Sequence, residues 1–294
     1  MLATLRPTLR GYVALTKPRI IELLLVTTVP PMFVAERGVP SLMLLLVAVG
    51  GGTLSAAGAN TFNMFIDRDI DAKMARTAQR PLVVGTVSPR AALVYGLVLE
   101  AAAFGILWLG ANLLAALLAL SACLFYVFVY TLWLKRWSAQ NIVIGGAAGA
   151  APVLVGWAAV TGSLSLEAWI AFAMVFFWTP PHFWALAIRY AKDYDAADVP
   201  MLPSVASERS VLVQMTLHTA VLIGLSLWFA VAADMAGLYW MVALAGGAAF
   251  GWQLIMLWRE LTLRQAMRVF HASIAYLGLL FAAMAVDVVV RLGW

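Results

Sequence analysis

The stretch NMFIDRDIDAKMARTAQRPL, residues 63–82, carries three aspartates, three arginines and one lysine. The rest of the chain is poor in charge, because only 11% of its 294 residues are charged and 64% are hydrophobic. Apolar runs at 41–62 and 91–109 flank the stretch, and each is close to the roughly 20 residues that a helix needs to cross a bilayer. We therefore predict that residues 63–82 begin a polar loop between two membrane-spanning helices.

Apolar runs of similar length recur along the whole sequence, whose mean hydropathy is +0.93. They are longer than the alternating strands of an outer-membrane barrel, so the predicted fold class is an all-α integral membrane protein. The chain is expected to be one domain, 1–294, with nine transmembrane helices at about 20–35, 41–62, 91–109, 112–133, 140–160, 167–188, 211–232, 238–257 and 270–290.

The basic residues predict how these helices are oriented. If the N-terminus is cytoplasmic, Arg37 and Arg291 are the only two of the 19 lysines and arginines on the outer side. This asymmetry satisfies the positive-inside rule, and it predicts a multi-pass protein of the cell inner membrane with its C-terminus on the opposite side. The net charge of +5 then reflects topology, so no nucleic-acid partner is expected.

Acidic residues gather in two inner loops, at about 63–90 and 189–209. The first loop holds Asp67, Asp69 and Asp71, and the second holds Asp193, Asp195 and Asp198. Four helices separate the two clusters, which predicts two four-helix halves followed by a ninth helix.

The first acidic loop has the spacing of a metal site. Asn63, Asp67 and Asp71 are four residues apart, so on a helix they lie along one face, whereas Asp69 points away. Oxygen ligands of this kind suit Mg²⁺, which commonly joins one or two carboxylates to a substrate phosphate. A solvated loop, in which the acids pair with nearby basic residues, is the alternative interpretation.

Arginines beside the acids favour a diphosphate ligand. Arg76 and Arg80 follow the aspartates, and guanidinium groups hold phosphate oxygens through paired hydrogen bonds. In the second loop, Asp193 would share a face with His182 if the helix persisted that far, with His182 about 16 Å deeper in the bilayer. Such a site has a polar mouth and an apolar depth, as an amphiphilic diphosphate requires. Gly145 and Gly149 would provide either close helix packing or room for a bulky ligand.

These motifs resemble those of a known family. Residues 63–82 resemble the first aspartate-rich motif of the UbiA superfamily of intramembrane prenyltransferases, and within it the chain is similar to the haem O synthases, or protohaem IX farnesyltransferases. Further matching segments are LTKPRI (15–20), YTLWLKRWSAQNIVIGGAAGAAPVLVGW (130–157), WTPPHFWALAIRYAKDYDAADVPMLP (178–203) and FHASIAYLGLLF (270–281).

The resemblance implies an enzyme that transfers a farnesyl group from farnesyl diphosphate to a vinyl group of haem b, giving haem O and diphosphate. It implies Mg²⁺ as cofactor, and a downstream haem-modifying membrane enzyme as a further partner beside the lipid bilayer. Asn63, Asp67, Asp71 and Asp193 would be catalytic, and Asp67, Asp71 and Asp193 would bind the metal. The diphosphate would be bound by Arg76, Arg80, Lys135 and Arg136.

The resemblance leaves some roles open. His182 is the expected haem contact, His271 is a second candidate, and His218 is expected to be a packed core residue. An aromatic quinone precursor is an alternative acceptor for the same chemistry. A transporter is a different class of hypothesis, although transporter acids usually lie near the bilayer midplane rather than in loops.

Overall fold

The structure is a computed structural model that describes residues 2–292, and within this range it is helical without strands. Nine spans among the described residues are long and apolar enough to cross a membrane, which confirms the predicted number. They are α2 (Pro18–Glu36), α3 (Leu42–Ile66), α5 (Pro89–Gly110), the composite span Leu113–Trp137, α8 (Asn141–Thr161), α9 (Leu166–Arg189), α12 (Glu208–Ala232), α13 (Gly237–Arg259) and α14 (Leu263–Leu292).

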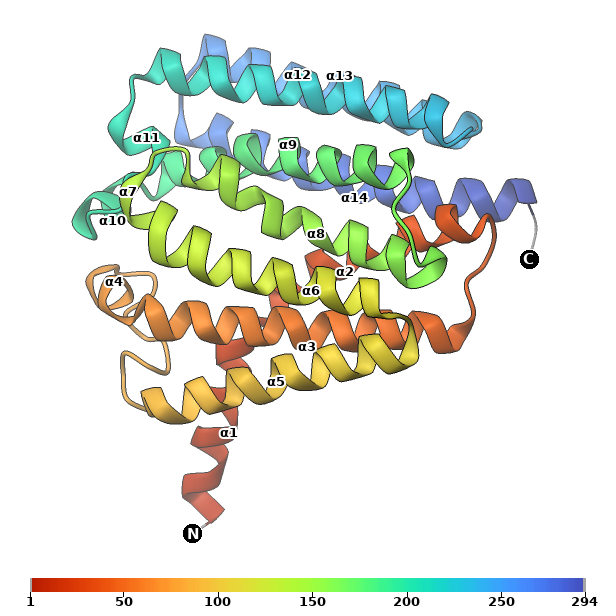
Figure 1. Cartoon of the computed structure of the whole chain (residues 1–294). Helices are drawn as coiled ribbons and strands as arrows, with labels where there is room; N and C mark the ends of the chain where they lie inside the picture. Colours follow the sequence, from red (N-terminus) through yellow and green to blue (C-terminus); the bar gives the residue numbers. More distant parts are fainter. Residues whose placement is uncertain (1, 293–294) are drawn as a thin grey trace.

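The composite fourth span changes its helical geometry partway. It begins as α6 (Leu113–Leu124), continues as the π-helix η1 (Phe125–Leu134), and ends in the short α7 (Lys135–Trp137). Four shorter helices complete the fold: α1 (Leu2–Thr16), α4 (Arg68–Lys73), α10 (Ala191–Ala196) and α11 (Leu202–Val205). Figure 1 shows α4, α7, α10 and α11 at the same end of the bundle.

The spanning helices pack in chain order, and α14 closes the arrangement by packing against α2. The contacts repeat with an offset of four helices. For example, α3 packs on α5 as α9 packs on α12, and α6 packs on α8 as α13 packs on α14. This repetition agrees with the prediction of two four-helix halves and a ninth helix.

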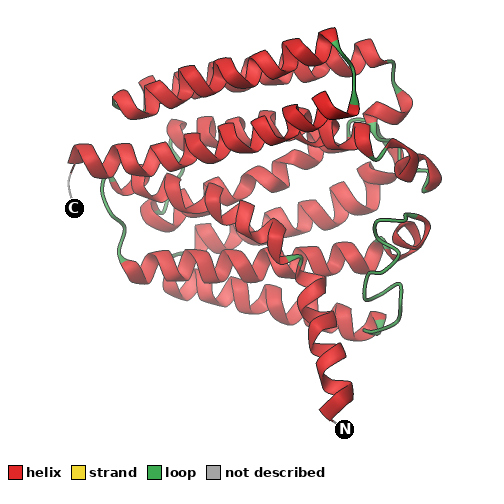
Figure 2. Cartoon of the chain, turned by 180° about the vertical axis from the view of Figure 1, so that it is seen from behind, coloured by secondary structure: helices red, strands yellow, loops and turns green. Residues whose placement is uncertain are grey.

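The N-terminal helix leaves the bundle at Lys17. This residue has a left-handed backbone conformation, with φ of 52°, and it precedes Pro18, which disfavours a helical conformation in the residue before it. As a result α1 runs across the direction of the other helices and projects from the bundle, as both views show (Figure 1, Figure 2).

Helices α8 and α9 form the centre of the molecule. About two thirds of their apolar windows are buried, 61% in α8 and 67% in α9, whereas outer helices such as α5 and α13 are only 28% buried. The remaining apolar surface of the outer helices is available to lipid, which explains why so many leucines and tryptophans are exposed.

Glycines let α8 approach its neighbours closely. A Cβ atom at Gly156 would lie 2.3 Å from the backbone oxygen of Thr28, and one at Gly145 would lie 2.2 Å from the ring of Tyr130. Gly149 has open space instead, with nothing within 4 Å of a Cβ. The small-residue segment of α8 therefore serves packing at Gly145, while Gly149 leaves room.

We predict that Gly156→Ala destabilises the protein, because the new methyl group meets the rigid backbone of α2. Overpacking of this kind costs about 1–3 kcal/mol. Gly149→Ala, in the same helix, is the matched control and should be neutral or stabilising by about 0.5–1 kcal/mol. Thermal unfolding of both variants in detergent measures the difference, and equal melting temperatures would contradict the proposed close approach of α8 and α2.

Candidate functional site

The helical register of α3 continues through the first acidic loop. The backbone N–H of Asp67 donates to Asn63 at 2.9 Å, and that of Asp71 donates to Asp67 at 2.8 Å. Asn63, Asp67 and Asp71 are consequently buried in a row, with 2%, 0% and 2% exposure, while the Asp69 side chain is 60% exposed. The predicted face, with Asp69 pointing away from it, is confirmed.

Basic side chains surround this row, which we call the aspartate row. Lys135 donates a hydrogen bond to Oδ2 of Asp67, and Asn63 donates to the same oxygen at 2.8 Å. Arg80 donates to both carboxylate oxygens of Asp71, at 2.7 and 2.6 Å. Charges buried to this extent require such partners, because an unpaired ion in a low dielectric is costly.

The sequence prediction missed Lys17. Its Nζ donates to Oδ1 of Asn63 at 2.6 Å, so it brings a further cation to the aspartate row from the junction of α1 and α2. Burial lowers the pKa of Lys17 to about 7, and the positive charges of Arg80 and Lys135 act in the same direction. The only signal in the sequence was that Lys17 precedes Pro18 in a basic segment. That segment was already accounted for by the positive-inside rule, so it gave no reason to place Lys17 in the site.

The other predicted cations have different partners. Arg136 forms two hydrogen bonds of 2.8 Å with Asp69, and these lower the pKa of Asp69 to about 2. Arg76 lies in a turn rather than on a helix, and its guanidinium stacks over the ring of Tyr190 at 5.3 Å. Lys135 and Arg80 thus donate hydrogen bonds to the aspartate row, whereas Arg136 comes only within 4.0 Å of Asp67 and Arg76 makes no ion pair with the described residues of the row.

The two acidic loops pack against each other. Lys73 pairs with Asp198 at 3.4 Å, and apolar side chains from both loops share one buried cluster, which includes Ile70, Met74, Val199 and Met201. Burial raises the pKa of Tyr194 in the second loop, and the charges of Arg76 and Arg80 oppose that rise. The two loops therefore lie next to each other and enclose one site.

Asp193 does not lie on the helix face that holds His182. Helix α9 ends at Arg189, and Tyr190 separates it from α10, so the condition for that alignment is not met. Asp193 is half-buried and has neither a hydrogen bond nor an ion pair from its side chain to the described residues, and Asp195 is exposed. The role of Asp193 as a metal ligand stays a prediction.

His182 is a buried residue whose ring is held on three sides. Trp178 and Phe270 stack on its two faces, at centroid distances of 4.1 and 4.6 Å, and Nδ1 lies 2.8 Å from Oγ of Ser273. Because Ser273 donates its only hydroxyl proton to Phe270 at 2.7 Å, Nδ1 of His182 must donate. The lone pair is then on Nε2, the nitrogen that a haem iron would use.

The other two histidines have local partners. His218 hydrogen-bonds to the carbonyl of Gln214 at 2.8 Å and packs beside Phe177 and Trp184. His271 is exposed, and its Nδ1 lies 2.6 Å from the carbonyl of Met267. Neither geometry matches the enclosed position of His182.

The described residues contain no group of three or more His, Cys, Asp or Glu arranged to hold a metal ion by themselves. One atom nevertheless suits a cation. Oδ1 of Asp67 is buried without a hydrogen-bond partner, and the guanidinium of Arg136 lies 4.0 Å from it. This fits Mg²⁺, which is commonly held by one or two carboxylates together with substrate phosphates and needs no complete set of protein ligands.

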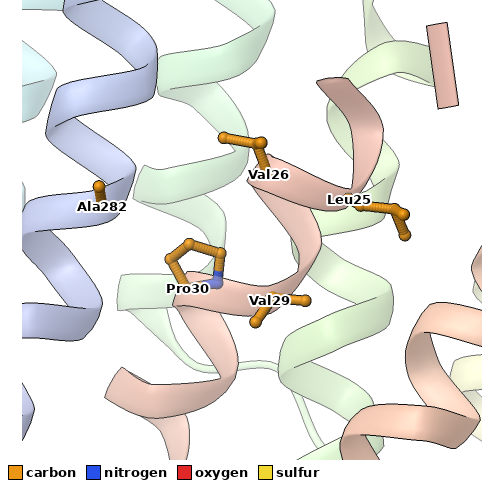
Figure 3. A pocket seen from close by; sticks show the side chains of 5 residues that line it. All are labelled: Leu25, Val26, Val29, Pro30 and Ala282. Atoms are coloured by element: carbon orange, nitrogen blue, oxygen red, sulfur yellow. The ribbon is translucent and has the colours of Figure 1, made fainter. Parts of the chain in front are cut away.

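An apolar hollow of about 370 Å³ lies between α2 and α14 (Figure 3). It is lined by Leu25, Val26, Val29, Pro30 and Ala282. Pro30 and Pro31 lie inside α2, which runs on through both. The hollow gives this side of the bundle a hydrocarbon-like recess beside the lipid.

Comparisons with known proteins agree on the family. The model of the UbiA prenyltransferase family matches residues 24–284. The chain is 50% identical over 283 residues to protoheme IX farnesyltransferase of Pseudarthrobacter chlorophenolicus, covering 95% of this chain and 89% of the relative. It is 52% identical over 293 residues to protoheme IX farnesyltransferase 1 of Saccharopolyspora erythraea, covering 98% and 92%.

Solved structures share the fold at low sequence identity. Digeranylgeranylglyceryl phosphate synthase has a TM-score of 0.80 at 17% identity, covering 96% of this chain and 99% of that one. A UbiA homolog from Archaeoglobus fulgidus bound to GPP and Mg²⁺ has a TM-score of 0.69 at 18% identity, covering 94% and 99%. The chain therefore belongs to the UbiA prenyltransferase family, in the branch of the protoheme IX farnesyltransferases, as its motifs predicted.

Proposed function

We propose that this membrane enzyme transfers a farnesyl group from farnesyl diphosphate to a vinyl group of haem b, with haem O and diphosphate as products. The observation that carries the proposal is the identity of about half of all residues, over nearly the whole chain, with relatives named for this reaction. We place the enzyme in the cell inner membrane, with the aspartate row at the cytoplasmic end, because the basic residues gather there.

The aspartate row is assigned to the metal and the diphosphate. Asp67 and Asp71, with Asn63 beside them and Asp193 from the second loop, are the residues that would hold Mg²⁺. The partnerless oxygen of Asp67 supports this assignment. So do family structures of the same fold that contain Mg²⁺ with GPP or DMAPP. Bound Mg²⁺ would neutralise the diphosphate as its allylic C–O bond breaks.

The basic side chains are assigned to the diphosphate oxygens. Lys17, Arg80 and Lys135 contact the aspartate row from three segments of the chain, so their charges converge on one small volume. As the C–O bond breaks, negative charge develops on the leaving group, and preorganised cations stabilise it without reorganising. Arg76 and Arg136 would bind the distal oxygens.

The apolar part of the site, deeper in the bundle than the aspartate row, is assigned to haem and to the farnesyl chain. The electron pair of the haem vinyl group attacks the farnesyl carbon, and a water molecule supplies the hydroxyl of haem O while releasing a proton. Buried aromatic residues around His182 would exclude other water from the cation, and Nε2 of His182 would bind the haem iron. The farnesyl chain would reach the site from the lipid through the hollow between α2 and α14.

The product combines haem with a farnesyl chain, so it is even more amphiphilic than its precursor. It would leave into the bilayer rather than into water. We therefore propose that the haem-modifying enzyme that receives it is also a membrane protein.

The first prediction tests the reaction and its metal ligands together. Membranes that express the chain should accumulate haem O, identified by the mass of the extracted haem. Asp67→Asn and Asp71→Asn should each reduce its formation by more than about 100-fold, because each removes a charged ligand of the metal that would stabilise the leaving diphosphate. Asp69→Asn should remain within about threefold, since it breaks only an exposed pair with Arg136.

Two results would count against this assignment. A prenylated quinone precursor in place of haem O would contradict the acceptor. Equal losses in all three well-folded variants would contradict the aspartate row as the metal site.

The second prediction concerns the basic residues. Lys17→Met and Arg80→Gln should each weaken Mg²⁺-dependent binding of farnesyl diphosphate by about tenfold, as expected for the loss of one charge-assisted hydrogen bond. Arg19→Met is the matched control, because Arg19 is an exposed cation two residues from Lys17. Isothermal titration of purified protein measures the affinity, and an unchanged affinity in Lys17→Met would restrict Lys17 to a structural role.

The third prediction separates the two ends of the site. His182→Ala should shift the absorption spectrum of bound haem and weaken haem binding, while Mg²⁺-dependent binding of farnesyl diphosphate is retained. Asp193→Asn should do the reverse. His271→Ala is the control, because His271 is exposed.

Parental haem affinity and spectrum in His182→Ala would exclude His182 as the iron ligand. Loss of haem binding in His271→Ala instead would assign the iron to His271. Ser273→Ala adds a milder variant, since it keeps the imidazole and removes only the acceptor that fixes its tautomer.

A further inference from the structure

A second cavity lies at the end of the bundle opposite the aspartate row. Its volume is about 630 Å³, within the range of small-molecule sites. It is surrounded by the C-terminal ends of α2, α8, α12 and α14 and by the start of α9. A residue of left-handed conformation turns the chain directly after α2, at Arg37, and directly after α8, at Gly162, and another, Asp234, lies two residues beyond the end of α12.

The cavity has an apolar floor and a polar rim. Val34, Trp157 and Val288 form the floor and are at most 8% exposed. The rim is polar, with hydroxyl groups from Thr161, Ser163 and Ser165 among the charged residues. This layering suits an amphiphile that places its apolar part over the indole and its head group at the water interface.

Four charged residues line the rim, and two of them neutralise each other. Arg291 pairs with Asp234 at 3.1 Å and also donates to its backbone carbonyl. The Arg37 side chain has no ion pair or hydrogen bond with the described residues, and Glu167 accepts a hydrogen bond only from the Ser165 hydroxyl. The cavity therefore offers one guanidinium and one carboxylate to a ligand.

The helix ends add to the negative side of this balance. The C-terminus of a helix carries a partial negative charge, and four such ends meet here beside the single N-terminal end of α9. A purely anionic ligand would satisfy Arg37 but would face Glu167 and these C-terminal ends. A purely cationic ligand would leave Arg37 facing a like charge.

We propose that this cavity binds a zwitterionic head group, in which a phosphate ester lies close to a primary ammonium, carried by a lipid of the outer leaflet. Arg37 contacts the phosphate, while Glu167 and the helix-end carbonyls accept from the ammonium. The glycerol and the first part of the acyl chains lie over Trp157. The site is separate from the farnesyl transfer site, so the proposal does not depend on the proposed reaction.

The experiment counts lipids retained by the full-length protein. The purified chain is equilibrated with vesicles of phosphatidylethanolamine, phosphatidylcholine and phosphatidylglycerol in equal amounts, and native mass spectrometry identifies what remains bound. We expect one phosphatidylethanolamine, retained about tenfold more than the other two lipids. Tailless O-phosphoethanolamine should not displace it, which distinguishes a lipid from a free phosphate ester.

Variants assign the two contacts. Arg37→Gln and Glu167→Gln should each lower retention of phosphatidylethanolamine about tenfold, as for one lost charge-assisted hydrogen bond. Arg37→Lys should retain part of it. Glu36→Gln is the matched control, because Glu36 is exposed next to Arg37 but does not line the cavity. Haem O formation should be unchanged in all four variants, which separates this test from that of the reaction.

Three outcomes overturn the proposal. Retention of all three lipids at equal levels would mean that the cavity does not select a head group. Preference for phosphatidylglycerol, lost in Arg37→Gln alone, would identify an anionic-lipid site. Displacement by O-phosphoethanolamine would show that the apolar floor plays no part.

Discussion

The burial of two carboxylates where α3 gives way to α4 is the constraint on which the rest of the site depends. Asp67 and Asp71 are 0% and 2% exposed, and isolated charges in such surroundings are not tolerated. Removing one partner of a buried ion pair typically costs about 3–5 kcal/mol. Each carboxylate must therefore receive a cation from another segment, and the chain has to bring those segments to one place.

The fourth span meets this requirement through its π-helix. In η1 the hydroxyl of Thr131 donates to the carbonyl of Tyr126 at 2.8 Å, and the same residue accepts from Asn63 at 3.1 Å. One turn later Lys135 reaches Asp67. A π-helix turns more slowly than an α-helix and is often found at functional sites. Here it aligns two polar side chains of one span with the aspartate row.

The sequence predicted the features that depend on local periodicity. The nine spans follow from hydrophobic length, and the buried row follows from a spacing of four residues, which the continuing helix preserves. It did not predict Lys17, whose role depends on a left-handed residue before Pro18. It also missed the break in the helix at Tyr190, which places Asp193 off the helix face that holds His182. The turn that places Arg76 over the Tyr190 ring was missed as well. These features depend on packing between segments that are distant in sequence, so periodicity does not reveal them.

The charged side chains of the aspartate row can exchange their hydrogen-bond partners for those of a ligand without becoming exposed to water. Lys17, Lys135 and Arg80 already contact Asn63, Asp67 and Asp71, and each cation can also donate to a phosphate oxygen. In the proposed reaction, a diphosphate with its metal would bring both signs of charge, so the carboxylates would bind the metal while the basic groups would bind phosphate oxygens. Neither the carboxylates nor the basic groups would have to be exposed to water again. The free-energy cost of desolvating them is already met when the chain folds, so ligand binding would not add it a second time. On this proposal, substrate binding and the stability of this end of the bundle depend on the same few side chains, which is why their polar contacts are so dense in a chain that is otherwise almost entirely apolar.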